Sequence, residues 1–250
     1  MSGMVLTIAS LAERPEMLDR VTGMADTWPA FLRNDLVGNA HYGRIARELP
    51  EYVLFAEDAD GEVVAHAYSV PFALGDEGAG ALPPRGWDEI LVWAFGDLRR
   101  GVVPDTVSAI SVVVAPHAQG TGLSGRMLAA MRDNARGRGF GEVVAPVRPS
   151  AKHLEPRTPM EEYAFRTRGD GLPHDPWLRV HVRAGGRVEA VAPASMTVAA
   201  SLDEWRGWTG LPFDEECLVE VPGALVPVHC EPAHGYAVYV EPNVWVRHVL

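Results

Sequence analysis

Hydrophobic and polar positions change their spacing several times along the chain, and each change predicts an element. An apolar, β-branched run over residues 111–114 predicts a buried strand, and a turn that contains glycine follows it. Apolar residues then recur at helical spacing, which predicts a helix with one buried face: Leu123, Met127, Leu128, Met131 and Ala135. Gly137 and Gly139 end this helix, and residues 142–147 again have a strand pattern. The middle of the chain is therefore predicted to be a β-α-β passage.

The segments before this passage predict a strand, two helices and a hairpin. The strand pattern covers residues 5–8, the helical patterns cover 16–27 and 41–49, and the hairpin strands cover 52–56 and 62–68. Residues 74–104 do not fit a minimal arrangement of these elements, and we interpret them as an insertion with a helix at 87–95. This helix either packs over a sheet edge or forms a lid over a binding site.

The segment after the β-α-β passage begins with a helix near residues 177–184 and continues with many short strand patterns. These patterns cover residues 188–191, 196–199, 218–221, 225–229, 236–240 and 244–249, and Ser201 caps a short helix at 202–208. This β-rich C-terminal extension, residues 187–250, extends the sheet, covers a binding site or supplies the edge of a homodimer. We interpret residues 1–250 as one elaborated domain.

Composition and charge limit the partners. The 250 residues are 47% hydrophobic, enough for a sizeable core, and their net charge of −11 argues against nucleic acid and anionic membranes. A cationic or amine-bearing small molecule suits this charge better. Two cysteines and the lack of an apolar segment of about twenty residues predict a cytoplasmic protein that does not enter the membrane. The nine histidines have no metal-binding spacing, so no metal is predicted.

The turn after the strand at 111–114 predicts a phosphate site. Strand, glycine turn and helix meet there, which leaves backbone N–H groups unpaired at the positive end of the helix dipole. A P-loop is excluded because no Gly-Lys-Ser/Thr follows, and the letters Gly-x-Gly-x-x-Gly over residues 120–125 lack the acidic residue of a dinucleotide site. The alternative interpretation is a plain strand-to-helix turn.

This segment resembles the acyl-CoA loop of the GCN5-related N-acetyltransferase superfamily, whose pattern after a strand is Gln/Arg-x-x-Gly-x-Gly/Ala. Gln119, Gly122 and Ser124 fill the three places, with serine replacing glycine or alanine. The resemblance covers residues 4–148 and implies an α/β (α+β) fold with a central, mixed, twisted β-sheet flanked by helices. It also implies acetyl-CoA as co-substrate, held by Val112, Val114, Gln119, Gly120, Thr121, Gly122, Leu123 and Ser124.

The resemblance further implies direct acetyl transfer from acetyl-CoA to the amine of a small molecule, without an acyl-enzyme. In the superfamily a tyrosine four residues before a glycine protonates the CoA thiolate, and His181 stands in that place before Gly185. Its imidazolium could serve as this acid, or the residue is structural. Upstream, Asp175 or Asp170 can hold the amine and His174 can accept its proton, or Asp175 caps the helix that begins at Pro176.

Two other functions keep this fold. A malonyl decarboxylase would use His181 with Thr121 or Ser111, and a non-catalytic module would bind acyl-CoA without turnover. Arg148 and Lys152 contact CoA phosphate or an acidic acceptor, or they are solvated surface charges.

Three aromatic residues on the first two predicted helices have two interpretations. Trp28, Phe31 and Tyr42 either line the acceptor pocket, as the resemblance implies, or belong to the core.

Overall fold

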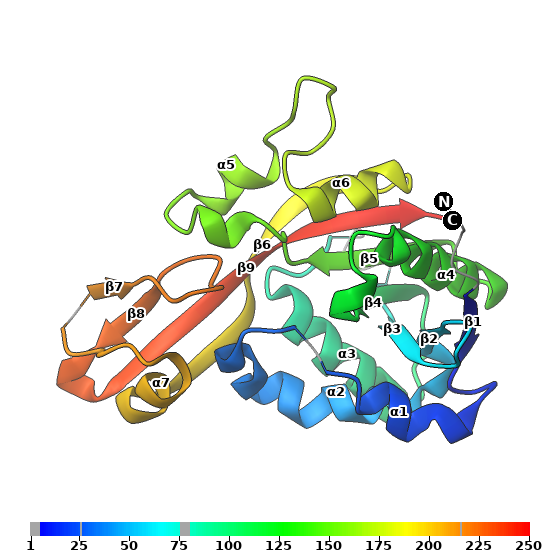
Figure 1. Cartoon of the computed structure of the whole chain (residues 1–250), viewed down its shortest axis with the longest axis horizontal. Coiled ribbons are helices and arrows are strands. Elements are labelled where there is room, and N and C mark those ends of the chain that lie inside the picture. The colour runs from blue at the N-terminus through cyan, green and yellow to red at the C-terminus, as the bar shows by residue number, and fades with distance from the viewer. Residues whose placement is uncertain (1–5, 26, 76–80, 216) are drawn as a thin grey trace.

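The computed structural model describes residues 6–25, 27–75, 81–215 and 217–250. Within these ranges a single sheet runs through the molecule (Figure 1). Its strands are β1 (Thr7–Ser10), β2 (Val53–Glu57), β3 (Val63–Phe72), β4 (Thr106–Val114), β5 (Glu142–Val147), β6 (Arg187–Ser201), β7 (Cys217–Val219), β8 (Val228–Glu231) and β9 (Tyr236–Val249). Eight of them lie in the order β1-β2-β3-β4-β5-β9-β8-β7, and β6 pairs with β9.

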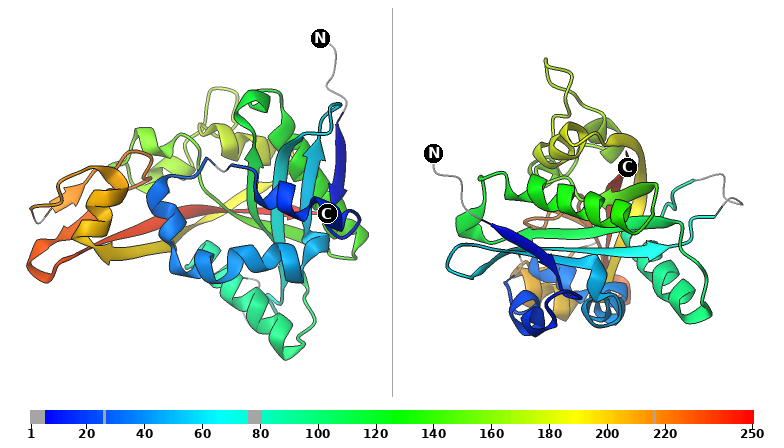
Figure 2. Two further views of the ribbon diagram at one scale, coloured as in Figure 1. Left: turned by 60° about the horizontal axis from the view of Figure 1, so that its bottom comes forward. Right: turned by 90° about the vertical axis from the view of Figure 1, so that its right-hand side faces the viewer.

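Helices cover both faces of this sheet. They are α1 (Leu18–Thr22), α2 (Leu36–Glu48), α3 (Gly86–Arg100), α4 (Leu123–Gly137), α5 (Met160–Ala164), α6 (Pro176–Arg183) and α7 (Leu202–Thr209). Figure 2 shows α1, α2 and α3 on one face and α4 and α6 on the other. The predicted apolar stripe of α4 is buried along its whole length. The expected mixed sheet flanked by helices is therefore confirmed.

The sheet opens between its two central strands. β4 and β5 are parallel, but they pair only at Val107 with Val143 and at Ser108 with Val144. Further along, each strand keeps only its outer neighbour, β3 or β9. The backbone edges of residues 109–114 and 145–147 are consequently not bonded to each other. Such an opening at the carboxyl ends of parallel strands is where ligands bind in open α/β sheets.

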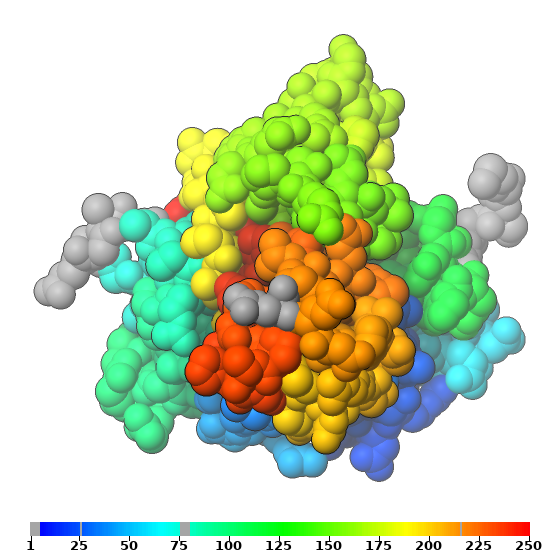
Figure 3. All heavy atoms as spheres, turned by 90° about the vertical axis from the view of Figure 1, so that its left-hand side faces the viewer, coloured from blue at the N-terminus to red at the C-terminus, as the bar shows by residue number. Residues whose placement is uncertain are grey.

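β6 and β9 are longer than expected, because each joins two predicted strands into one. β9 continues through Pro242, which has no backbone N–H to donate. The paired strand β6 is irregular at this point, between Ala192 and Met196, and this irregularity accommodates the proline. On its other edge β9 pairs first with β8 and then with β5. Residues 239–243 therefore cross from one part of the sheet to the other. Figure 3 shows the end of the molecule where β8, the start of β9 and α7 lie together.

Several element boundaries differ from the sequence pattern. α2 begins at Leu36, because the Asp35 side chain accepts a hydrogen bond from the Gly38 N–H at 2.5 Å and caps the helix. The pattern at residues 16–27 yields only the short α1 after a 3₁₀ turn, and α3 extends to Arg100. α3 packs on β3, on α2 and on β6, which among the described strands pairs only with β9.

Parts of the predicted domain organisation are outside the described residues. Positions 5, 26 and 76–80, which belong to the first strand, the first helix and the insertion, are among them. The division into an insertion at 74–104 and an extension at 187–250 stays a prediction. No helix in the described ranges has the length and apolar character needed to cross a membrane.

Candidate active site

A cavity of about 790 Å³, the main cavity, lies where β4 and β5 separate. β4 contributes residues 109–113 and β5 contributes residues 145–147, so both opened strand edges border it. The segment after β4, helix α6 and strand β9 contribute the following polar or aromatic residues: Gln119, Ser124, Trp177, His181, Glu241 and Asn243. The fold thus brings the predicted phosphate loop and His181 to one site.

The phosphate loop is fixed by hydrogen bonds to its own backbone. The Gln119 side chain donates to the Val114 carbonyl at 3.2 Å, and the Thr121 hydroxyl donates to the Ala118 carbonyl at 2.7 Å. Thr121 is therefore occupied within the loop, and it does not line the main cavity. Leu123, which is buried, anchors the start of α4 under the sheet.

The N-terminus of α4 keeps its backbone donors free of side-chain caps. Its N-cap residue Gly122 has φ +83°, Gly120 has φ +75°, and Gly122 makes no capping hydrogen bond. These left-handed conformations suit glycine and turn the chain sharply. Gly120 and Ser124 border the main cavity. Uncapped N–H groups at a helix N-terminus form a site for an anion.

β4 places its residues along one wall of the main cavity. Val112 borders the cavity and is half-buried, and Val114 is half-buried at the end of the strand, where its carbonyl accepts from Gln119. Both strands next to the opening have free backbone edges, so an extended ligand with amide groups can pair with them.

His181 lines the main cavity from α6 and contacts His248 of β9. Its Nδ1 lies 3.0 Å from His248 Nε2, and both side chains are buried. Burial, and then the neighbouring His248, lowers the pKa of His181 to about 3. Burial and the charge of Arg132 lower the pKa of His248 to about 4. These shifts favour the neutral form of both rings at pH 7, and the role of His181 as an acid stays a prediction.

Asp175 is a helix cap and does not reach the cavity. Its carboxylate is fully buried and accepts from the Trp177 and Leu178 N–H groups at 2.8 and 3.0 Å. It also accepts from the Ala151 N–H at 2.9 Å and the Tyr163 hydroxyl at 3.0 Å. Because both oxygens are occupied, the expectation that Asp175 holds the amine is corrected in favour of capping.

His174 does not reach the cavity either. Its side chain is exposed, and its ring packs edge-on to Tyr163 with the centroids 6.1 Å apart. It is not among the residues that line the main cavity. The expectation that His174 accepts the proton of the amine therefore has no geometric support.

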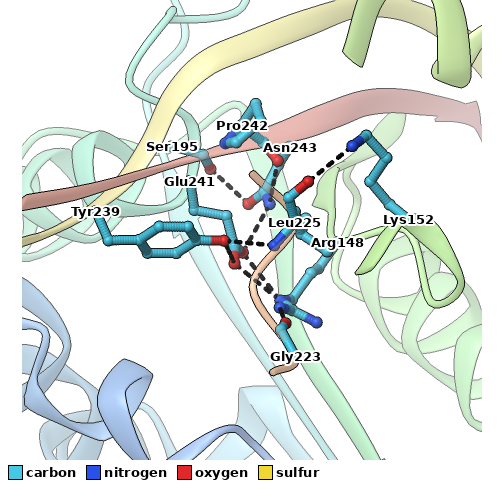
Figure 4. Close-up of polar contacts among 9 residues, drawn as sticks. All are labelled: Arg148, Lys152, Ser195, Gly223, Leu225, Tyr239, Glu241, Pro242 and Asn243. Carbon is cyan, nitrogen blue, oxygen red and sulfur yellow. Dashed lines mark hydrogen bonds and ion pairs between the residues drawn. The ribbon is translucent and has the colours of Figure 1, made fainter. Parts of the chain in front are cut away.

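Sequence reasoning missed a buried polar network on β9 (Figure 4). Glu241 has no exposed surface, and Arg148 Nε donates to its two oxygens at 3.1 and 3.0 Å. The Tyr239 hydroxyl and the Asn243 side-chain amide donate to Glu241 at 2.8 and 3.1 Å. Ser195 donates to Asn243 at 2.6 Å. Glu241 and Asn243 border the main cavity, so this network forms part of its wall.

Arg148 and Lys152 both have hydrogen-bond partners within the fold, and Arg148 also borders the main cavity. The Arg148 guanidinium is paired with Glu241 and also donates to the Gly223 carbonyl. Lys152 is fully buried, and its ammonium donates to the Glu155 and Leu225 carbonyls, both at 2.7 Å. Neither is a solvated surface charge, and their charges are satisfied without a phosphate.

A second cavity of about 350 Å³ adjoins the main cavity. Trp28, Trp87 and Met196 line both. The Tyr42 hydroxyl in the second cavity and the Ser111 hydroxyl in the main cavity are 2.7 Å apart. A ligand that extends past these shared residues would reach β4, where the two cavities meet.

The three aromatic candidates separate into two groups. Trp28 and Tyr42 line the second cavity, as a pocket wall requires. Phe31 is buried in the core between Trp205 and Tyr239, with centroid distances of 5.7 and 5.2 Å. In the described part of the chain, no group of three or more His, Cys, Asp or Glu residues is arranged to hold a metal ion.

No family model matches the chain. The arginine N-acetyltransferase avaD of Aspergillus versicolor is 32% identical over an alignment of 276 positions, gaps included, that covers 97% of this chain and 93% of that protein. Among solved structures, the loading GNATL domain of CurA from Lyngbya majuscula has a TM-score of 0.62 at 18% identity and covers 98% of both chains. The GphF GNAT-like decarboxylase in complex with isobutyryl-CoA has a TM-score of 0.59, also at 18% identity with 98% of both chains covered.

At these identities the two solved structures show the fold alone, whereas the Aspergillus relative matches nearly all of both sequences. The uncapped start of α4 is the feature that the glycine turn after the strand predicted. The chain therefore belongs to the GCN5-related N-acetyltransferase superfamily and is an N-acetyltransferase.

Proposed function

We propose that this enzyme transfers the acetyl group of acetyl-CoA directly to an amine of arginine or of another small molecule with a guanidinium group. The observation that carries this proposal is the similarity to an arginine N-acetyltransferase along nearly the whole of both chains. The net charge of −11 supports it, since an acidic protein attracts cationic acceptors.

The donor occupies the main cavity. The N–H groups of residues 119–124 hold the CoA pyrophosphate at the N-terminus of α4, where the helix dipole favours negative charge. The pantetheine arm extends between β4 and β5, where the strand edges do not pair with each other. A β4 N–H near Val112 or Val114 then polarises the thioester carbonyl.

The reaction passes through a ternary complex. The acceptor ammonium loses one proton, its nitrogen attacks the thioester carbon, and the carbon–sulfur bond breaks to leave the CoA thiolate. A second proton leaves the nitrogen, so that one proton reaches sulfur and one reaches solvent. When His248 donates a hydrogen bond to Nδ1 of His181, the proton of the neutral His181 ring lies on its other nitrogen. From that nitrogen His181 donates a hydrogen bond to the thiolate.

Decarboxylation has less support. The pair His181 and Thr121 is not assembled, because the Thr121 hydroxyl donates to Ala118 and lies outside the cavity lining. Ser111 and His181 do share the main cavity, but the likeness to the decarboxylase is one of fold. Conversion of malonyl-CoA to acetyl-CoA and CO2 without an amine would be the outcome that favours this second function.

Binding of acetyl-CoA is tested with Ser124→Asp and a matched control. The new carboxylate lies in the first turn of α4, where it favours the helix but repels the pyrophosphate. We expect the melting temperature of the free protein to be kept and the Kd for acetyl-CoA to rise by at least about tenfold. Ala129→Asp places the same charge at an exposed position further along α4 and should leave the Kd unchanged.

Acetyl transfer is tested by thiol release from acetyl-CoA with arginine, agmatine, lysine and citrulline as acceptors. The proposal predicts thiol release and an acetylated product with arginine. If acetyl-CoA binds at the loop but none of these amines is acetylated, the proposed function is wrong.

A further inference from the structure

Two buried carboxyl groups near the second cavity each have one oxygen without a hydrogen-bond partner. Asp35, 2% exposed, accepts from the Gly38 N–H through Oδ1, and its Oδ2 has no partner. Asp88, 3% exposed, accepts from the Thr197 N–H at 3.2 Å through Oδ2, and its Oδ1 has no partner. A buried carboxylate oxygen without a partner is costly, and Asp35 lines the second cavity, so its free oxygen marks a place where a ligand can donate a hydrogen bond.

The two carboxyl groups interact with each other. Burial, and then the charge of Asp35, raises the pKa of Asp88 to about 8, and Glu241 adds to this effect. Burial also raises the pKa of Asp35. Among the described residues, no ion pair includes Asp35 or Asp88, whereas Glu241 is paired with Arg148. Neither carboxyl group therefore has a direct ion-pair partner among these residues.

Other charged or titratable groups also face this region. Arg85, at the start of α3, acts on Asp88 in the opposite direction to Asp35 and favours its charged form. Arg33 and His66 line the second cavity, and both have other interactions.

Aromatic rings form much of the second cavity. Tyr42 stacks on Tyr68 and Trp87, with the centroids 4.7 and 6.2 Å apart, and Trp28 lies 6.5 Å from Trp87. All four residues line the cavity together with Asp35. Flat aromatic faces next to a carboxylate suit a planar guanidinium, which stacks on rings and donates two parallel hydrogen bonds to carboxylate oxygens.

We propose that the second cavity binds the guanidinium of the acceptor, with Asp35 as its direct partner and Asp88 as a second carboxyl group that interacts with Asp35. The reacting amine then extends past Trp28, Trp87 and Met196 toward β4 in the main cavity. This assignment rests on the proposed function, because it gives the acceptor of that reaction its binding site.

A bound cation changes the protonation of the pair. In the free enzyme at pH 7 the Asp88 carboxyl holds its proton, and a guanidinium next to Asp35 favours the ionised form. Binding of a cationic acceptor therefore releases protons, whereas binding of a neutral molecule of the same shape does not. Arginine and citrulline are such a matched pair, because citrulline carries a neutral urea group in place of the guanidinium.

Calorimetric titration with arginine and citrulline, with and without saturating CoA, tests the proposal on wild type, Asp35→Asn and Asp88→Asn. Asparagine caps a helix as well as aspartate does, so Asp35→Asn keeps the cap of α2 and removes only the charge. We expect the Kd for arginine to rise by at least about tenfold in Asp35→Asn and the Kd for citrulline to stay the same. Asp19→Asn, an exposed change of equal charge on α1, should change neither value.

Titrations in buffers of different ionisation enthalpy count the protons released. At pH 7 wild type should release a fraction of a proton for each arginine bound, and Asp88→Asn should abolish this release. The inference is overturned if Asp35→Asn binds arginine as tightly as wild type does, or if it weakens citrulline equally. Thiol release is scored separately on wild type and Asp35→Asn. Equal amine acetylation by both proteins overturns the site alone, whereas arginine binding that depends on Asp35 without any acetylation overturns the function alone.

Discussion

Replacement of Asp88 by asparagine should stabilise the protein, and the gain should depend on pH. Asparagine keeps the oxygen that accepts from the Thr197 N–H and cannot ionise. Wild-type Asp88 has a pKa of about 8 in the fold because of burial and the charge of Asp35, but it titrates near 4 in the unfolded chain. Between these two values the folded protein holds a proton that the unfolded chain has lost.

The size of the effect follows from this difference in proton binding. When the folded state binds one proton more, the free energy of unfolding falls by about 1.4 kcal/mol per pH unit. Between pH 5 and pH 7 the free energy of unfolding of wild type should therefore fall by up to about 3 kcal/mol relative to that of Asp88→Asn. For a chain of this size that corresponds to roughly 5–10 °C in melting temperature. The gain should level off above pH 8, where the folded carboxyl ionises as well.

Thermal unfolding of wild type and Asp88→Asn at half-unit steps from pH 5 to pH 9 measures this difference. In an Asp35→Asn background, loss of the neighbouring charge lowers the pKa of Asp88, so the gain should level off at a lower pH. A difference in melting temperature that is constant from pH 5 to pH 8 would refute the reasoning. It would mean that Asp88 ionises in the fold as it does in the unfolded chain.

Other changes test the packing and the chemistry. Arg148→Met leaves the fully buried Glu241 without its cation and should lower the free energy of unfolding, measured by chemical denaturation, by about 3–5 kcal/mol. A second change, Glu241→Gln, should restore this stability, and a single variant as stable as wild type would contradict the reason. Gly86→Ala places a Cβ against the Ser195 hydroxyl at a residue with φ +37° and should lower the free energy of unfolding by about 3 kcal/mol. Because the Trp87 N–H donates to Ser195, Trp87 should shift and the KM for the acceptor should rise; an unchanged melting temperature would argue against this reasoning. His181→Gln should lower kcat and leave both the KM for acetyl-CoA and the pH dependence of kcat unchanged, because the low pKa of His181 keeps its ring neutral near pH 7. If wild-type kcat changes with pH around 6.5 and the variant loses this change, the imidazolium does act as the acid.

The central part of the fold could be predicted because its signals are local. The strand at 111–114, the glycine turn and the stripe of α4 lie next to one another in the sequence, and the structure keeps all three. β9 was divided in two because Glu241-Pro242-Asn243 has the composition of a turn. Whether a strand continues through proline depends on its partner, and the irregular part of β6 lies about 50 residues away in the sequence.

The same distinction separates the site residues that were found from those that were missed. The phosphate loop is one continuous segment, whereas the acceptor cavity takes Asp35 from the cap of α2 and aromatic residues from several elements. In the sequence, Asp35 and Asp88 have the pattern of ordinary acids at helix starts, and their unpaired oxygens become visible only when α2, α3 and β6 pack together. His248 likewise meets His181 only through the pairing of β9.

The position of β9 also has a consequence for how the enzyme is assembled. β9 carries Glu241, Asn243 and His248, and it pairs with β5, whose residues 142–147 precede it by about a hundred positions. Contacts between such distant segments form late, because closing a long loop costs entropy before any pairing repays it. Until β9 docks, β5 has an open strand edge on that side, which invites association with other chains. Catalytic competence is thus acquired in a late folding step, and substitutions in β9 should lower the yield of soluble enzyme before they change its kinetics.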